Sequence, residues 1–352
     1  MAEKILIYRL GSLGDTVVAL PCFHLIRRAF PSAEIRVLTN QPVSPNAPRL
    51  SSVLAGTDLA DGYFEYPIRT KDIGALRSLG RSIRAWGPDK IVYLTLRGRR
   101  LTVLRDLAFF ALFCGVRRFI GAPFRRDLLE FRALPNGLSE RECERLSRCL
   151  SRLGDAHPED PRNWDLQLTA DEKAAAERIV TTQIAPAPFI ALCVGTNWPA
   201  NDWGDANWHR VTRDLLNRHA HKIVFVGGNA ERARADALTA MDPGRFVNLC
   251  GRLAVRETAS VLARAALYVG HDTGPMHLAA AVGTPIVALF GNRSKPGIWF
   301  PMGGRSRILY RDSPTASVSM IEPDEVVDAV ADLLAPPAAD KADSAQRRRA
   351  VT

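Results

Sequence analysis

The sequence predicts an α/β protein with two doubly wound, Rossmann-like parallel sheets that face each other across a cleft. Three observations predict this class. Short β-branched segments alternate with segments of helical apolar spacing in both halves of the chain, which is the pattern of parallel strands joined by helices. The length of 352 residues is large for a single domain. A polar, proline-containing stretch at 154–163 separates the two series.

The first half opens with a strand, a helix and a strand in immediate succession. This order predicts parallel strands joined by a right-handed crossover. Pro21 lies well inside the expected helix, and predicts either a kink or a later helix start. The expected elements of this half are strands at 4–10, 34–38 and 90–94 and helices at 16–30 and 101–114.

The second half repeats the alternation. Its expected strands are 189–194, 222–226, 267–269 and 285–290, and its helices are 169–180, 208–218, 230–240, 257–265, 274–282 and 322–334. Thr169 and Glu172 have the spacing of a capping box. Residues 335–352 are rich in proline, alanine and charge, which predicts a disordered tail. We therefore expect an N-terminal domain over 1–163 and a C-terminal domain with a closing helix over 164–334.

The composition is that of a globular protein with excess positive charge. Lys and Arg number 47 against 37 Asp and Glu, a formal net charge of +10. No apolar run approaches the ~18–20 residues that span a bilayer. Arg9 interrupts the N-terminal apolar stretch too early for a signal peptide, so we expect a cytoplasmic location. The six cysteines include no CxxC pair, and we expect reduced core residues and no metal site.

The positive charge is concentrated in one segment. Residues 97–132 hold nine arginines against three acidic residues, a local excess of six positive charges. Arginines on solvated helix faces are ordinary, but a patch of this density favours an anion-binding surface. Nucleic acid is not the expected partner, because aromatic residues make up only 7% of the chain and no recognition motif is present.

The strongest local motif is HDTGPMHLAAAVGTP, which begins at His271. The chain leaves a buried strand, turns through Asp272 and enters an alanine-rich helix. The amides of Thr273 and Gly274 then lie at a helix N-terminus, which suits a diphosphate. His277 lies about one turn further, within reach of the same phosphate. Asp272 as a helix cap and His277 as a core histidine would each be ordinary, but the run as a whole favours binding.

The second motif is the turn Gly11-Ser-Leu-Gly-Asp15. It places Asp15 at the carboxyl end of the first strand, where open parallel sheets bind their ligands. A helix-capping role for Asp15 is the equal alternative. The G-x-G-x-x-G spacing of dinucleotide-binding proteins is absent. A Tyr-x-x-x-Lys pair is also absent, which argues against a nicotinamide-dependent sugar oxidoreductase or epimerase.

Together the two motifs resemble the ADP-heptose:lipopolysaccharide heptosyltransferases, glycosyltransferase family 9. KILIYRLGSLGD and HDTGPMHLAAAVGTPIVALFG carry the resemblance, with shorter blocks at 118–121, 226–232 and 249–253. It implies a GT-B fold that holds the acceptor in the N-terminal domain and the nucleotide sugar in the C-terminal one. It also implies an inverting transfer that needs neither a metal nor a cofactor.

The resemblance further implies individual roles. Asp15 matches the general base, and Asp272, Thr273, Gly274 and His277 match the donor-contacting motif. Glu231 matches a ribose-contacting carboxylate, and Thr196 a hydroxyl on the phosphate side of the donor.

Asn201 departs from the family pattern, because the family usually has a lysine there. Asp202 beside it is unfavourable for a phosphate. Another cation, Lys295 or Arg293, substitutes for the lysine, or the donor differs, or activity is reduced.

The expected partners are an ADP-linked sugar donor and an anionic glycolipid or oligosaccharide acceptor such as the lipopolysaccharide inner core. The candidate acceptor-binding residues are Arg97, Arg99, Arg100, Arg117 and Arg118. Their segment also suits a peripheral contact with the cytoplasmic face of the inner membrane. The alternatives are a family relative with another nucleotide-sugar donor and a non-catalytic nucleotide- or glycan-binding protein.

Overall fold

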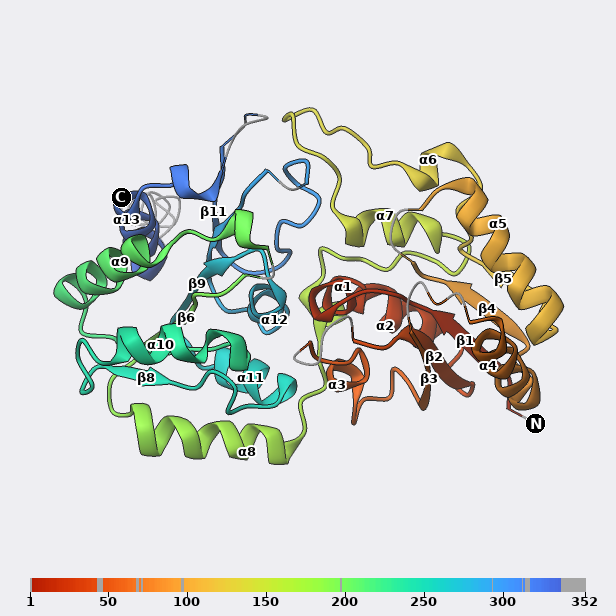
Figure 1. The fold of residues 1–352 in the computed structure, drawn as a ribbon, viewed down its shortest axis with the longest axis horizontal. Coiled ribbons are helices and arrows are strands. Elements are labelled where there is room, and N and C mark those ends of the chain that lie inside the picture. Colours follow the sequence, from red (N-terminus) through yellow and green to blue (C-terminus); the bar gives the residue numbers. More distant parts are fainter. Residues whose placement is uncertain are drawn as a thin grey trace, which may run out of the picture.

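The computed structural model describes residues 2–42, 47–67, 70, 72–95, 98–196, 198–292, 294–311, 313 and 317–336. Within these ranges the chain forms two parallel sheets, one in each half of the molecule (Figure 1). The predicted tail lies outside the described residues from 337 onward. None of the described helices is long and apolar enough to cross a bilayer.

The N-terminal sheet has the strand order β3-β2-β1-β4-β5, with every neighbouring pair parallel. The order reverses between β1 and β4, so the sheet is doubly wound as expected. Its strands are β1 (Lys4–Tyr8), β2 (Glu34–Asn40), β3 (Gly62–Tyr66), β4 (Lys90–Tyr93) and β5 (Phe119–Ile120). Its helices are α1 (Leu13–Val18), α2 (Leu20–Ala29), α3 (Ser51–Leu54), α4 (Ile73–Trp86), α5 (Arg100–Phe109), α6 (Arg126–Leu129) and α7 (Glu142–Cys149).

The C-terminal sheet has the order β11-β10-β9-β6-β7-β8, also parallel throughout. Its strands are β6 (Phe189–Cys193), β7 (Lys222–Phe225), β8 (Phe246–Asn248), β9 (Leu267–His271), β10 (Ile286–Leu289) and β11 (Ser306–Leu309). Its helices are α8 (Ala170–Ile179), α9 (Asp205–Arg218), α10 (Arg232–Thr239), α11 (Val255–Leu262), α12 (Gly274–Ala281) and α13 (Pro323–Leu334). The predicted capping box opens α8, because Thr169 Oγ1 accepts from the Glu172 amide at 3.2 Å.

Two helices differ from the sequence prediction in an informative way. The helix expected at 16–30 begins earlier, at Leu13, and divides at Ala19 into α1 and α2. Pro21 is the second residue of α2, where its missing N–H costs no helical hydrogen bond. The helix expected at 101–114 is present, and its last turn, Phe110–Cys114, is a π-helix.

The two sheets meet through short helices near the middle of the molecule, where α1 faces α12 (Figure 1). Gly14 makes this approach close, since a Cβ built on it would lie 2.9 Å from His277 Cδ2. Arg256 on α11 forms a second connection, donating to the carbonyls of Val53 and Leu166 at 2.9 Å each. The division of the chain at residue 163 stays a prediction.

Candidate active site

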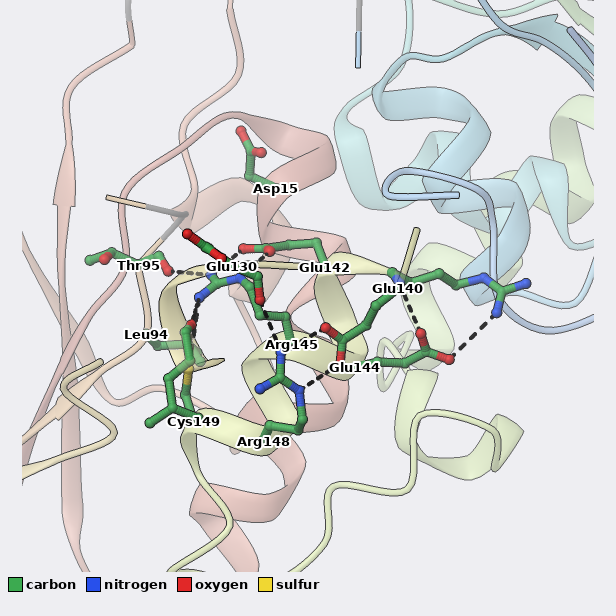
Figure 2. Close-up of polar contacts among 12 residues, drawn as sticks. Asp15, Leu94, Thr95, Glu130, Glu140, Glu142, Glu144, Arg145, Arg148 and Cys149 are labelled. Carbon is green, nitrogen blue, oxygen red and sulfur yellow. Dashed lines mark hydrogen bonds and ion pairs between the residues drawn. The ribbon is translucent and has the colours of Figure 1, made fainter. Parts of the chain in front are cut away.

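Asp15 lies on α1 at the carboxyl end of β1, one residue after the contact with His277. Its Oδ2 accepts from the Ser12 amide at 2.5 Å and from Ser12 Oγ at 2.8 Å. Ser12 is the only donor to this carboxylate among the described residues, and Figure 2 shows the carboxylate pointing away from the buried ion pairs beneath it. Asp15 therefore caps α1 with Oδ2, and its other carboxylate oxygen accepts no hydrogen bond from the described residues.

Gly11 is required for this placement. Its φ of +142° is disfavoured for residues with a side chain. A Cβ at this position would lie 2.5 Å from Asp15 Cβ and 2.7 Å from Oδ2. The Asn40 side chain accepts from the Gly11 amide at 2.8 Å and fixes the turn. The absence of a side chain on Gly11 thus leaves the space that the Asp15 carboxylate occupies.

A buried arginine supports Asp15 from below. Arg9 is fully buried, donates to the Leu94 carbonyl at 3.1 Å and also donates to the backbone carbonyl of Asp15. Burial lowers the pKa of Arg9, and the carboxylates of Asp15 and Glu142 oppose that shift. The arginine joins the ends of β1 and β4 under the candidate base.

A second buried arginine extends this network (Figure 2). Nε and Nη2 of Arg145 each lie 2.7 Å from an oxygen of the Glu142 carboxylate, and neither side chain is more than 1% exposed. Arg145 also donates to the carbonyls of Leu128 and Thr95 at 3.0 Å each. This pair was not predicted from the sequence. The one visible signal was Arg9, an arginine directly after the apolar run at 5–8.

The loop after β10 is tied to the same region. The amides of Ser139 and Glu142 donate to the carbonyls of Pro296 and Ile298, at 2.8 and 3.0 Å. Gly297 allows this contact, because a Cβ there would lie 2.1 Å from the Ser139 carbonyl oxygen. The C-terminal loop that carries Lys295 is therefore held against the segment that carries Glu142.

The α12 motif has the predicted form. Thr273 is the cap of α12 and Gly274 its first residue, so their amides have no helical acceptor. His277 is 5% exposed, and its Nε2 lies 3.5 Å from Asp272 Oδ1. The contact between α1 and α12 brings this motif and Asp15 together where the two halves of the molecule meet.

Thr196 and Glu231 lie at the carboxyl edge of the C-terminal sheet, after β6 and β7. Glu231 Oε2 accepts from the Gly228 amide at 2.7 Å. Its side chain rests on Gly195, where a Cβ would be 2.2 Å from Glu231 Cγ. Thr196, the next residue, accepts from the Trp198 amide at 3.2 Å. The structure therefore brings the two predicted donor residues side by side.

His271 is part of the support of this edge. It is 1% exposed, its Nε2 accepts from the Trp203 amide at 3.2 Å, and its Nδ1 lies 3.0 Å from the Gly195 carbonyl. An Nε2 acceptor requires a neutral ring whose Nδ1–H donates to Gly195. Burial lowers the pKa of His271 to about 4.

Asn201 lies against Gly291, since a Cβ on that glycine would be 2.5 Å from Asn201 Oδ1. Asp202 beside it pairs with Arg234 through both carboxylate oxygens, at 3.0 and 2.8 Å. Arg234 also pairs with Asp205 at 2.7 Å, so it offsets the Asp202 charge only in part, and the expectation that Asp202 disfavours a phosphate stays a prediction. Gly291 also borders a pocket of about 370 Å³ that contains Lys295. Of the two candidate substitute cations, Lys295 lines this pocket, and Arg293 lies outside the described residues.

The basic segment divides into two parts. Arg99 and Arg100 line a pocket of about 510 Å³ together with Gly98, Arg126, Leu129 and Glu130, which we call the arginine pocket. Arg126 was not among the candidates from sequence. Arg117 and Arg118 are exposed beyond the other end of the 100–114 helix and do not line this pocket. Arg97 lies outside the described residues.

Solved structures share this architecture. A glycosyltransferase family 9 protein from Veillonella parvula aligns over 95% of this chain and 97% of its own, with a TM-score of 0.74 and 19% identity. ADP-heptose LPS heptosyltransferase II from E. coli aligns over 94% and 98%, with a TM-score of 0.68 and 21% identity. Two facing Rossmann-like domains of this form are the GT-B fold of glycosyltransferases.

The sequence comparisons give the family. Residues 140–323 match the model of glycosyltransferase family 9 (heptosyltransferase). Lipopolysaccharide heptosyltransferase 2 of Salmonella typhimurium is 22% identical over 313 residues, which span 87% of each protein. The chain belongs to glycosyltransferase family 9, and it is a glycosyltransferase.

Proposed function

We propose that this enzyme transfers heptose from ADP-heptose to the inner core of lipopolysaccharide. The transfer inverts the anomeric centre, needs no metal, and uses Asp15 as general base. The observation that carries the proposal is the meeting of Asp15 with the α12 motif through Gly14 and His277. The names of the similar heptosyltransferases from Salmonella typhimurium and E. coli support the donor and acceptor classes.

Asp15 would take the proton from the acceptor hydroxyl as its oxygen attacks the anomeric carbon. A sugar hydroxyl is a weak nucleophile, so a positioned carboxylate is needed. Attack from the base side expels the diphosphate on the opposite face, which inverts the configuration. The Ser12 hydrogen bonds hold one carboxylate oxygen and leave the other for this proton.

The departing ADP gathers negative charge on its diphosphate. The amides of Thr273 and Gly274, which have no acceptor within the helix at the start of α12, would meet that charge, helped by the helix dipole. Lys295 would supply the cation that the family usually places at position 201, with the Asn201 amide as a neutral hydrogen-bonding group. Glu231 would accept from the ribose hydroxyls, beside Thr196 on the phosphate side.

The acceptor would approach through the N-terminal domain. Arg99 and Arg100 follow the carboxyl end of β4, the same sheet edge that carries Asp15. An anionic inner core would bind in the arginine pocket, with an affinity that falls as salt rises. Because the proposed acceptor is a glycolipid, we also propose a peripheral contact with the cytoplasmic face of the inner membrane.

The test is turnover of ADP-heptose with a deacylated inner-core acceptor in the presence of EDTA. Parent enzyme, Asp15→Asn and the control Asp72→Asn are compared. Asp72 caps α4 through the Ala75 amide at 3.0 Å, a role that asparagine also fills. We expect turnover in the parent and control, a loss of about 10²–10⁴-fold in Asp15→Asn, and unchanged ADP binding in calorimetry.

Three outcomes would contradict parts of the proposal. Full activity in Asp15→Asn would exclude Asp15 as the base. ADP binding without heptose transfer, but with transfer from another nucleotide sugar, would establish the alternative donor. ADP or glycan binding with no transfer from any donor would leave a non-catalytic binding protein.

A further inference from the structure

The outer face of the helix formed by α5 and its π-helical end carries an unusual row of apolar side chains. Leu101, Leu104, Ala108 and Leu112 are all exposed, and their spacing places them on one face of the helix. We call this row the α5 apolar stripe. Leu101 is 78% exposed and Leu112 71% exposed. The helix packs inward through Val103, Phe110 and Cys114, all at most 3% exposed.

The stripe is concentrated compared with the rest of the surface. Nine large apolar side chains are exposed among the described residues, and three of them, Leu101, Leu104 and Leu112, belong to the stripe. Scattered exposed leucines are ordinary, whereas a continuous row marks a surface that meets an apolar phase. The segment is about 22 Å long at 1.5 Å per residue, so it can lie on a bilayer but cannot cross one.

Arginines surround the stripe. Arg99 and Arg100 lie at its start, Arg117 and Arg118 follow its end, and all four are exposed. Arg105 lies along the same face, with 71% of its side chain exposed despite its ion pair with Asp106. A helix with leucines outward and arginines around them is suited to the boundary between anionic headgroups and acyl chains.

We propose that the α5 apolar stripe docks the enzyme on an anionic lipid bilayer. A second copy of this chain is a poorer occupant, because pairing two stripes would bring two sets of five arginines together. The helix lies at the outer side of the N-terminal sheet, away from α9 and α13 (Figure 1). Docking would therefore leave the C-terminal domain clear of the membrane.

The inference deepens the proposed function by naming the surface that would place the enzyme beside a lipid-anchored acceptor. The arginine pocket begins at Gly98 and Arg99, next to the first residue of the helix. A headgroup at the start of the stripe would thus be next to that pocket, on the edge of the sheet that carries Asp15.

The first experiment is flotation with vesicles. Parent protein is mixed with vesicles of phosphatidylglycerol and phosphatidylethanolamine, or of phosphatidylcholine alone. The test variant is Leu101→Ser/Leu112→Ser, and the matched control is Met241→Ser/Met320→Ser, which changes two exposed residues of the C-terminal half. We expect binding to the anionic vesicles only, weaker at high salt, and lowered about 30-fold in the leucine variant but not in the control.

The second experiment locates the contact. The six native cysteines are free and buried, so a cysteine introduced at the surface can be labelled selectively. An environment-sensitive dye on Leu104→Cys should shift to the blue on anionic vesicles, whereas the dye on Met320→Cys should not. Shifts of equal size at both positions would overturn the proposal.

Three further results would also overturn it. These are the absence of parent binding to anionic vesicles, equal binding by the leucine variant, and loss of a concentration-dependent dimer in that variant. Turnover of the deacylated, water-soluble acceptor separates this inference from the proposed function. Both leucine and methionine variants should retain it, and vesicle binding without any turnover would count against the proposed donor and acceptor alone.

Discussion

Removing one partner of the Glu142–Arg145 pair should strongly destabilise the N-terminal domain. Arg145→Met leaves the Glu142 carboxylate, 1% exposed, without the two nitrogens that lie 2.7 Å from it. Breaking a buried ion pair in this way costs about 3–5 kcal/mol. The carbonyls of Leu128 and Thr95 also lose the hydrogen bonds from Arg145. We expect a loss of about 4 kcal/mol in the free energy of unfolding.

Urea unfolding followed by circular dichroism measures this loss, and two further variants test its cause. In Glu142→Leu/Arg145→Met the stranded charge is gone, so the double variant should be about 2 kcal/mol more stable than Arg145→Met. Arg141→Met breaks an ion pair of the same spacing between the N-cap of this helix and Glu144, in which both side chains are 32% exposed. It should cost less than about 1 kcal/mol.

A cost for Arg145→Met no larger than that for Arg141→Met would show that burial does not make this ion pair important. A double variant less stable than Arg145→Met would show that the cost does not come from an unpaired buried charge. Activity gives a separate readout. Arg145 holds the Thr95 carbonyl beside the Arg9 contact at Leu94. Arg145→Met should therefore lower kcat by a larger factor than it changes the KM for the donor.

Three other predictions concern the turn, the buried histidine and the donor cation. Gly11→Ala should lower kcat at least 10-fold with ADP binding unchanged, because its Cβ would displace Asp15; unchanged kcat would show that the carboxylate tolerates the shift. His271 has a pKa of about 4 when folded, below the usual 6.5, so the unfolded state binds the extra proton. Stability should therefore fall by about 3 kcal/mol as pH drops from about 6.5 to 4, measured as urea midpoints, and His271→Gln should remove most of this slope. Lys295→Ala should raise the donor KM about 10-fold, and adding Asn201→Lys to that variant should restore the KM. If neither substitution changes the KM, the donor phosphate does not bind beside these two residues.

The order of strands and helices could be predicted from sequence wherever a strand was buried on both faces. β1 and β6 are continuous apolar runs, and both were predicted at nearly their observed bounds. β3 and β11 are edge strands with half-buried or exposed residues. Their sequences, GYFEY and SRIL, lack the apolar signal of an interior strand, and both were missed.

The residues of the candidate site also differ in whether they could be predicted from the sequence. The Asp15 turn and the α12 motif could be found because each lies within one short segment. The Glu142–Arg145 pair could not, because its meaning depends on burial and on carbonyls at residues 95 and 128. Arg117 and Arg118 were grouped with Arg99 by their nearness in sequence, but a helix of fifteen residues separates them.

The contact of Gly14 with His277 has a consequence for hydrolysis of the sugar donor by water. The proposed base belongs to one half of the molecule and the helix proposed to bind the diphosphate to the other, so the two lie together while α1 touches α12. If the halves separate to admit substrate, a nucleotide sugar bound at α12 would not have the Asp15 carboxylate beside its anomeric carbon. Water reaching the sugar in that state would not meet the proposed base. Hydrolysis would thus be suppressed by geometry, without a dedicated lid.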